Sequence, residues 1–155
     1  MKNKWFFFGS ITLVMLLLSL FIPIRVLEIK TDNETRWLKA DEFEIGWIHS
    51  VEKEPWFESY RVKDDGLYLT GTRFKTFGAG VPAEGKIVPS DDGFVHMTLN
   101  RRMEEIWMSA SANVRTTLYT KGQEFKFYPD TGESGTVSIS SVKVPLWRLI
   151  GGIGS

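Results

Sequence analysis

A histidine and a glutamate are spaced so that two neighbouring strands would bring their side chains together. Residues 47–60 predict a β-hairpin whose loop is residues 52–55. Strand side chains alternate with period two, so His49 falls opposite Glu58 on a face that is otherwise apolar and aromatic. A carboxylate that accepts a hydrogen bond from imidazole fixes its tautomer, as in many general bases and metal ligands. Because burial of charge is costly, the pair indicates either a structural contact that sets the register or a functional site.

A second group of polar residues precedes a glycine-rich turn. Arg73 and Lys75 are followed by Gly78 and Gly80, and glycine can adopt positive φ and bring backbone N–H groups close to a ligand. These residues predict an anion site for a small carboxylate, and the alternative is a plain glycine turn. A bulge at Gly71 would change the face on which Arg73 lies. The candidate residues for binding a ligand or partner are His49, Glu52, Glu58, Arg73, Lys75, Gly78 and Gly80.

Other chemistries find little support in the residue types. The chain has no cysteine, which excludes disulfides and thiol catalysis, and its two histidines have no recognised metal spacing to other ligands. Ser50 directly follows His49, so in a regular strand the two side chains point to opposite faces and cannot form a nucleophile–base pair. The sequence predicts no catalytic residue, no metal and no cofactor.

The elements that position these residues are predicted to be short strands separated by turn signals. Their spacing of roughly 8–12 residues favours an all-β domain, a single antiparallel β-sandwich or barrel-like structure. This domain is expected to cover residues 42–155, with the tail at 145–153 packing as an edge segment. The predicted strands are residues 42–51, 56–63, 67–77, 94–99, 105–109, 115–119, 124–128 and 136–144.

The N-terminus predicts the compartment. A short basic leader precedes residues 6–24, which carry no charge and would form a helix roughly 28 Å long, close to the thickness of a bilayer core. We expect residues 1–25 to be an uncleaved transmembrane signal anchor and residues 26–41 a linker. The basic residues before the apolar run favour a cytoplasmic N-terminus and an extracytoplasmic domain. Secretion after cleavage of a signal peptide is the alternative.

The charge balance excludes one class of partner. Lysine plus arginine equals aspartate plus glutamate at 19 each, and the first 30 residues hold four of the basic and one of the acidic side chains. The remaining 15 basic and 18 acidic residues form no basic patch, so nucleic-acid binding is not expected.

Two blocks of this sequence, together with a weaker third, resemble a known family. Residues 47–58, with the run His-Ser-Val-Glu followed by Trp-x-Glu, and residues 72–81, with Gly-Ala-Gly, are similar to domain-of-unknown-function family 1850. Asp92-Gly-Phe-Val matches the third block. The resemblance implies a small exported or anchored bacterial protein encoded beside TAXI-type tripartite ATP-independent periplasmic (TRAP) transporters. The cysteines that some relatives carry near the C-terminus are absent here.

These observations lead to three functional hypotheses. The leading one is a membrane-anchored extracytoplasmic accessory module for TRAP-type uptake, which binds a transporter membrane subunit, the solute-binding protein or a small carboxylate solute. The second is a hydrolase or isomerase in which His49 acts as a general base oriented by Glu58. The third is a structural envelope protein without a ligand, in which the pair only fixes the register.

Overall fold

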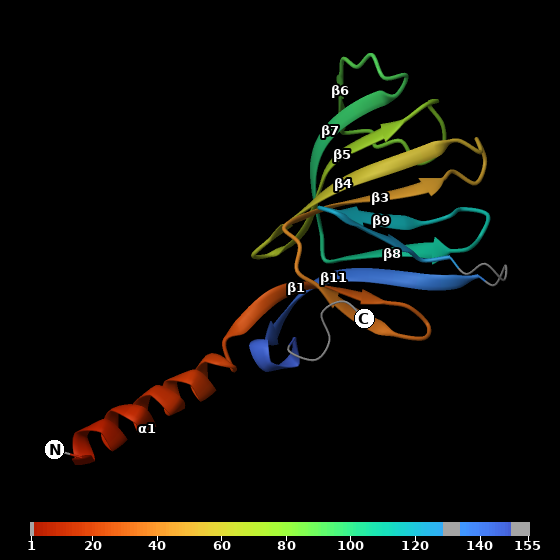
Figure 1. Ribbon diagram of the computed structural model, residues 1–155. Coiled ribbons are helices and arrows are strands. Elements are labelled where there is room, and N and C mark those ends of the chain that lie inside the picture. Colours follow the sequence, from red (N-terminus) through yellow and green to blue (C-terminus); the bar gives the residue numbers. More distant parts are fainter. Residues whose placement is uncertain (1, 129–133, 150–155) are drawn as a thin grey trace.

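Two antiparallel sheets make up the β-domain in this computed structural model, which describes residues 2–128 and 134–149, with side chains from Phe8 onward (Figure 1). The smaller sheet has the order β2-β1-β11-β8, with β1 (Pro23–Lys30), β2 (Thr35–Leu38), β8 (Glu105–Ala110) and β11 (Gly135–Pro145). The larger has the order β10-β9-β3-β4-β5-β7-β6, with β3 (Glu42–Ile48), β4 (Pro55–Lys63), β5 (Gly66–Phe74), β6 (Lys86–Val88), β7 (Val95–Met103), β9 (Thr117–Thr120) and β10 (Gln123–Lys126). The predicted all-β class is confirmed, and the described strands do not close into a barrel.

The main hydrophobic core lies between the inner faces of the two sheets. The smaller sheet contributes apolar side chains from β1, β8 and β11, and the larger contributes them from β3, β4, β5 and β9. The buried members are Leu27, Ile29, Phe43, Ile45, Tyr60, Leu67, Leu69, Ile106, Ala110, Leu118, Val137 and Ile139. The alternation of these residues along each strand gives every central strand one face in the core.

The β3–β4 hairpin has the predicted inner face but a different register. Trp47 pairs with Trp56, and Ile45 pairs with Glu58. The prediction that His49 lies opposite Glu58 was therefore wrong. Strand β3 ends at Ile48, and a wider turn joins it to Pro55, closed by the bond from the His49 N–H to the Glu54 carbonyl (2.8 Å).

The bulge expected near Gly71 is confirmed. The pairing of β5 shifts between Leu69 and Gly71 relative to β7, and β4 shifts at the same level. One extra residue in β5 reverses the alternation, so Leu69 and Thr72 share the inner face while Arg73 is on the outer face.

The N-terminal prediction needs two corrections. Helix α1 spans Lys2–Ser19 and so ends before residue 24, because Pro23 disfavours a helical residue before it and begins strand β1. Residues 26–41 are not a linker, since they contain most of β1 and all of β2. In the described part of the chain, no helix has both the length and the apolar character needed to cross a bilayer.

The C-terminal segment joins the base of α1 to the smaller sheet. The N–H of Leu146 donates to the Ile22 carbonyl (3.1 Å), and the N–H of Trp147 donates to the Leu20 carbonyl (3.1 Å). After the short 3₁₀ helix η1 (Leu146–Arg148), Leu149 is buried against Val26 and Val144. The tail thus packs on the outer face of the smaller sheet, and residues 150–153 of the predicted edge segment lie outside the described residues.

Candidate functional site

A pocket of about 400 Å3 opens between the inner face of the larger sheet and strand β8. Aromatic and aliphatic side chains line most of it, with a few polar groups among them, as is typical of ligand pockets. The lining residues are Trp47, His49, Ser50, Trp56, Glu58, Tyr60, Ala79, Gly80, Met103, Ile106, Trp107, Met108, Ser109, Val114 and Thr116. Three of the sequence-predicted site residues, His49, Glu58 and Gly80, are therefore brought together here.

Glu58 is the acidic group of this pocket. It lies two residues from Tyr60 on β4, so both side chains are on the inner face, and the Tyr60 hydroxyl donates a hydrogen bond to the Glu58 carboxylate. Burial raises the pKa of Glu58, while this hydrogen bond and the charge of Arg101 oppose the rise. Burial, followed by the neighbouring carboxylate, also raises the pKa of Tyr60. The site therefore favours a carboxyl group that retains its proton at a higher pH than an exposed glutamate.

A row of stacked aromatic rings crosses the strands beside Glu58. The Trp56 ring lies between Phe74 (centroids 4.6 Å apart) and Trp47 (6.0 Å), and the His49 ring also stacks on it (5.4 Å). Trp56 is buried, and its Nε1 has no hydrogen-bond partner among the described residues. Trp47, His49 and Trp56 line the pocket, and stacking on one another holds their rings in position.

His49 is oriented by the turn and not by Glu58. Its Nδ1 accepts from the backbone N–H groups of Val51 and Glu52 (both 3.4 Å) and also contacts the Glu52 carboxylate, and both side chains are largely buried. The argument that separated Ser50 from His49 assumed a regular strand, but both residues follow the end of β3 and both line the pocket. The imidazole–carboxylate contact expected from the sequence thus exists with Glu52 as the acid.

The opposite wall is built by the segment that links β8 to β9. The Thr116 hydroxyl donates to the Ser109 carbonyl (2.7 Å), and the Ile48 N–H donates to the Val114 carbonyl (2.6 Å). These bonds tie the segment to both β8 and β3. The sequence reasoning missed this wall, because nothing local marks residues 114–116 as neighbours of the hairpin.

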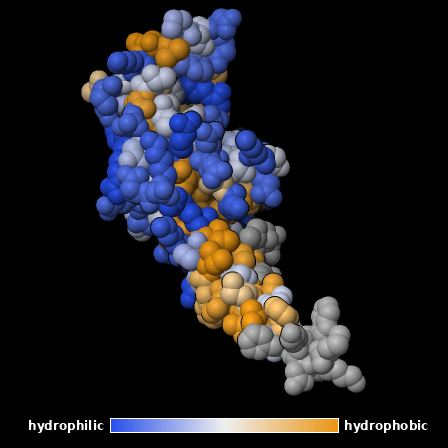
Figure 2. All heavy atoms as spheres, turned by 90° about the vertical axis from the view of Figure 1, so that its left-hand side faces the viewer, coloured by the Kyte–Doolittle hydropathy of each residue, from blue (hydrophilic) through white to orange (hydrophobic). Residues whose placement is uncertain are grey.

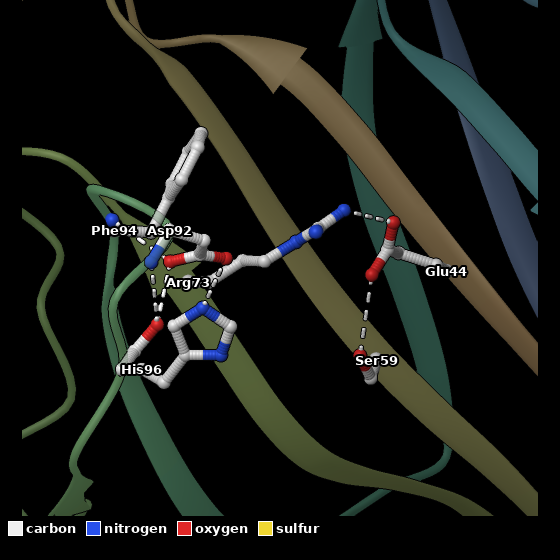
Figure 3. Close-up of polar contacts among 7 residues, drawn as sticks. Glu44, Ser59, Arg73, Asp92, Phe94 and His96 are labelled. Atoms are coloured by element: carbon white, nitrogen blue, oxygen red, sulfur yellow. Dashed lines mark hydrogen bonds and ion pairs between the residues drawn. The ribbon is translucent and has the colours of Figure 1, made fainter.

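Arg73 lies on the outer face of the larger sheet, away from the pocket. Its Nη2 pairs with the Glu44 carboxylate (2.7 Å), which also accepts from the Ser59 hydroxyl (3.5 Å), as Figure 3 shows. The guanidinium lies over the Phe57 ring at 4.0 Å. Lys75 approaches the Phe94 ring at 5.7 Å. The predicted grouping of these two cations with His49 and Glu58 is not formed, because the bulge turns Arg73 outward.

A histidine–carboxylate contact accompanies Arg73 on this outer face. His96, paired with Arg73 across β5 and β7, places Nε2 2.9 Å from an Asp92 carboxylate oxygen (Figure 3). The Ser90 hydroxyl, then His96, and then the Phe94 N–H lower the pKa of Asp92 to about 2. These contacts hold the loop before β7 in place, because Ser90, Phe94 and His96 all bond to the Asp92 carboxylate.

The glycine segment divides between two environments. Gly80 has φ of +89° and lines the pocket, so the expectation of a left-handed glycine is met there. Gly78 is packed against the Glu52 carboxylate, and a side chain at this position would collide with it. In the described part of the chain, no group of three or more His, Cys, Asp or Glu residues is placed to hold a metal ion.

A family model for a domain of unknown function, DUF1850, matches residues 43–127. The chain belongs to this family. No curated protein and no solved structure was found to match the chain. The DUF1850 match begins within β3 and ends just after β10, so it takes in all of the larger sheet except the first residue of β3, together with β8. The pocket is therefore built from the family domain, whereas β1, β2 and β11 support it from outside the match.

Proposed function

We propose that this protein is a membrane-anchored, extracytoplasmic binding module that assists TRAP-type solute uptake. The observation that carries the binding function is the pocket itself, in which a half-buried carboxyl group, Glu58, stands among the aromatic rings of Trp47, Trp56 and Tyr60. A buried titratable group at a concave apolar site is a frequent mark of ligand binding. The partners we propose are the transporter membrane subunit and its solute-binding protein, on the strength of the family resemblance.

Helix α1 supports the membrane part of this proposal. The apolar side chains of α1 from Phe8 to Leu18 and of the turn after it are exposed, and Figure 2 shows this part as an orange projection from a largely hydrophilic domain. Such a surface needs an apolar cover. The basic leader residues Lys2 and Lys4 favour a cytoplasmic N-terminus. The exposed residues include Phe8, Ile11, Leu13, Val14, Met15, Leu16, Leu17, Leu18, Phe21 and Ile22.

Among the described residues that line the pocket, no lysine or arginine is placed to bind a carboxylate solute. The proposal of an anion site required Arg73 and Lys75 beside the glycine segment, and both lie on the outer face near Phe57 and Phe94. The pocket offers an acid to a ligand in place of those cations. The proposed binding module is therefore not expected to bind a carboxylate in this pocket.

Topology and partnership are tested together in membranes of the native host. Because the chain has no cysteine, Ile87→Cys on β6, a position that is 63% exposed, can be labelled alone with a membrane-impermeant maleimide. We expect labelling without lysis of the inner membrane and co-purification of a TRAP subunit with the tagged full chain. Labelling only after lysis would refute the extracytoplasmic domain. A preparation in which neither subunit co-purifies, with the transporter present, would refute the partnership.

One observation favours a second candidate, an extracytoplasmic hydrolase or isomerase. His49 lines the pocket, and its ring is held by the turn through contacts at Nδ1, which leaves Nε2 as the nitrogen that could act as a general base. Glu52 takes the role that the sequence assigned to Glu58. Turnover of a panel of small esters and amides should then be lost in His49→Gln and retained in His96→Gln, a matched histidine on the outer face. Equal rates in both variants would rule this candidate out.

A further inference from the structure

The described residues that line the pocket hold one carboxyl group, that of Glu58, and no lysine or arginine. His49 is the basic side chain, and its Nδ1 is engaged by Glu52. A ligand that enters therefore meets a carboxyl group with no fixed cation beside it at the pocket surface.

The cation whose charge acts on Glu58 is paired with another acid. Arg101 lies on β7 and acts on Glu58 through its charge, but its Nε donates to Glu84 at 2.6 Å. Arg73 is held by Glu44 on the other side of the sheet. A carboxylate ligand would thus face Glu58 without a compensating partner, which disfavours anions as occupants of this pocket.

The walls suit a positive charge. The rings of Trp47 and Trp56 line the apolar space, and Trp107, whose side chain is 67% exposed, lines it too. The face of an aromatic ring attracts cations through the ring quadrupole, and sites lined by several aromatic rings recognise quaternary ammonium groups. Met103 and Met108 add polarisable surface of the kind that adapts to methyl groups.

From this geometry we propose that the pocket binds a small organic cation of the quaternary ammonium class, with its charged head between Glu58 and the tryptophans. The inference rests on the proposed binding function and names its ligand class. A cation beside Glu58 forms an ion pair that this carboxyl group does not make with any described residue, so binding favours the ionised acid. Ligand uptake is then accompanied by proton release at a pH at which the empty site holds a proton.

Three probes of equal shape separate the alternatives. Choline carries the cation, 3,3-dimethylbutan-1-ol is its uncharged counterpart, and 3,3-dimethylbutanoate is an anion of similar size. Titration calorimetry with the full chain in nanodiscs, in two buffers of different ionisation enthalpy, measures affinity and proton release. We expect choline to bind at least about tenfold more tightly than the alcohol, and the anion to bind least.

The Glu58→Gln variant provides the decisive comparison. It should weaken choline about tenfold or more, abolish the proton release and leave the affinity for the alcohol unchanged. Glu104→Gln, which removes an exposed carboxylate next to β8, is the matched control and should behave as wild type. The inference is overturned if the alcohol or the anion binds as tightly as choline, if no probe binds, or if Glu58→Gln leaves choline affinity intact. Because the binding-module proposal is tested by labelling and co-purification, either one can fail without the other.

Discussion

The hydroxyl of Tyr60 donates a hydrogen bond to the carboxylate of Glu58, two residues before it on the same strand. The period of two in β4 places both side chains toward the core, where Tyr60 is 2% exposed. A phenol and a carboxyl group are thus held together in the pocket: Glu58 makes Tyr60 harder to ionise, while the Tyr60 hydroxyl partly offsets the burial that disfavours ionised Glu58. This relationship connects the fold to the proposed binding chemistry and gives the clearest tests.

The first prediction concerns stability against pH. The folded protein holds the Glu58 proton more tightly than the unfolded chain, whose glutamates titrate near pH 4.5. The contribution of Glu58 to stability is therefore complete below pH 4.5 and falls as the pH rises through the raised folded pKa. In Glu58→Gln this fall is absent, so the stability difference between wild type and variant should change with pH. Urea unfolding from pH 4 to pH 8 measures it, and a constant difference would contradict the raised pKa.

A second prediction removes the other partner. Tyr60→Phe deletes a donor to a carboxyl group and should cost about 1–2 kcal/mol of unfolding free energy. Because the hydroxyl opposes the rise in the pKa of Glu58, its loss should move the pH-dependent fall in stability to higher pH. Tyr68→Phe, whose hydroxyl bonds to Asp65 at the surface, is the matched control and should stay within about 0.5 kcal/mol. Similar losses in both variants would argue against a special role for the buried pair.

The third prediction tests the packing of the outer face. A Cβ at Gly46 would stand 2.7 Å from the Phe57 ring and 3.1 Å from the Tyr119 ring. Gly46→Ala should therefore displace these aromatics and destabilise the domain by about 1–3 kcal/mol in chemical denaturation. Gly71→Ala, a strand glycine with no neighbour closer than 3.5 Å, is the comparison and should be near neutral. An equal effect of the two substitutions would refute the role of the ring contact.

The fourth prediction separates the two faces of the larger sheet. Arg73→Gln breaks the ion pair with Glu44 and the stacking on Phe57, and both are partly exposed, so the loss should be about 1 kcal/mol or less. Probe binding in the pocket should be unchanged, since Arg73 does not line it. Calorimetry with choline provides the readout. A large loss of affinity in this variant would show that the outer face and the pocket are coupled.

The sequence predicted the face of the hairpin but not its register. Period-two alternation correctly placed Trp47, Trp56, Glu58 and Tyr60 on one side, because it depends on local geometry alone. The register depends on the turn, and the turn contains Lys53 in a left-handed conformation (φ 57°) that the lysine itself does not signal. Because this turn is wider than expected, His49 lies after the end of β3 and contacts Glu52 and not Glu58.

The strands that were missed carry little signal in the local sequence. All eight expected strands are present within a few residues, but β1 and β2 were assigned to the anchor and linker, and β6 was not expected. The burial of β1 depends on β11, which lies far along the chain, whereas β6 is a three-residue exposed edge strand next to β7. The separation of Arg73 from the pocket was predictable in part, since the bulge at Gly71 was the feature that could turn it outward.

The pairing of β1 with β11 has a consequence for how the domain is made. Strand β1 pairs with β11 from Pro23 and Pro145 onward, so the backbone groups on that edge of β1 have no strand partner until β11 has been synthesised. During synthesis, Leu27 and Ile29 remain without the cover of Val137 and Ile139 until nearly the whole chain has emerged. The larger sheet, by contrast, is assembled from strands that are complete by Lys126. The order of synthesis therefore favours a domain whose pocket-bearing sheet forms first and whose closing sheet is added at the end.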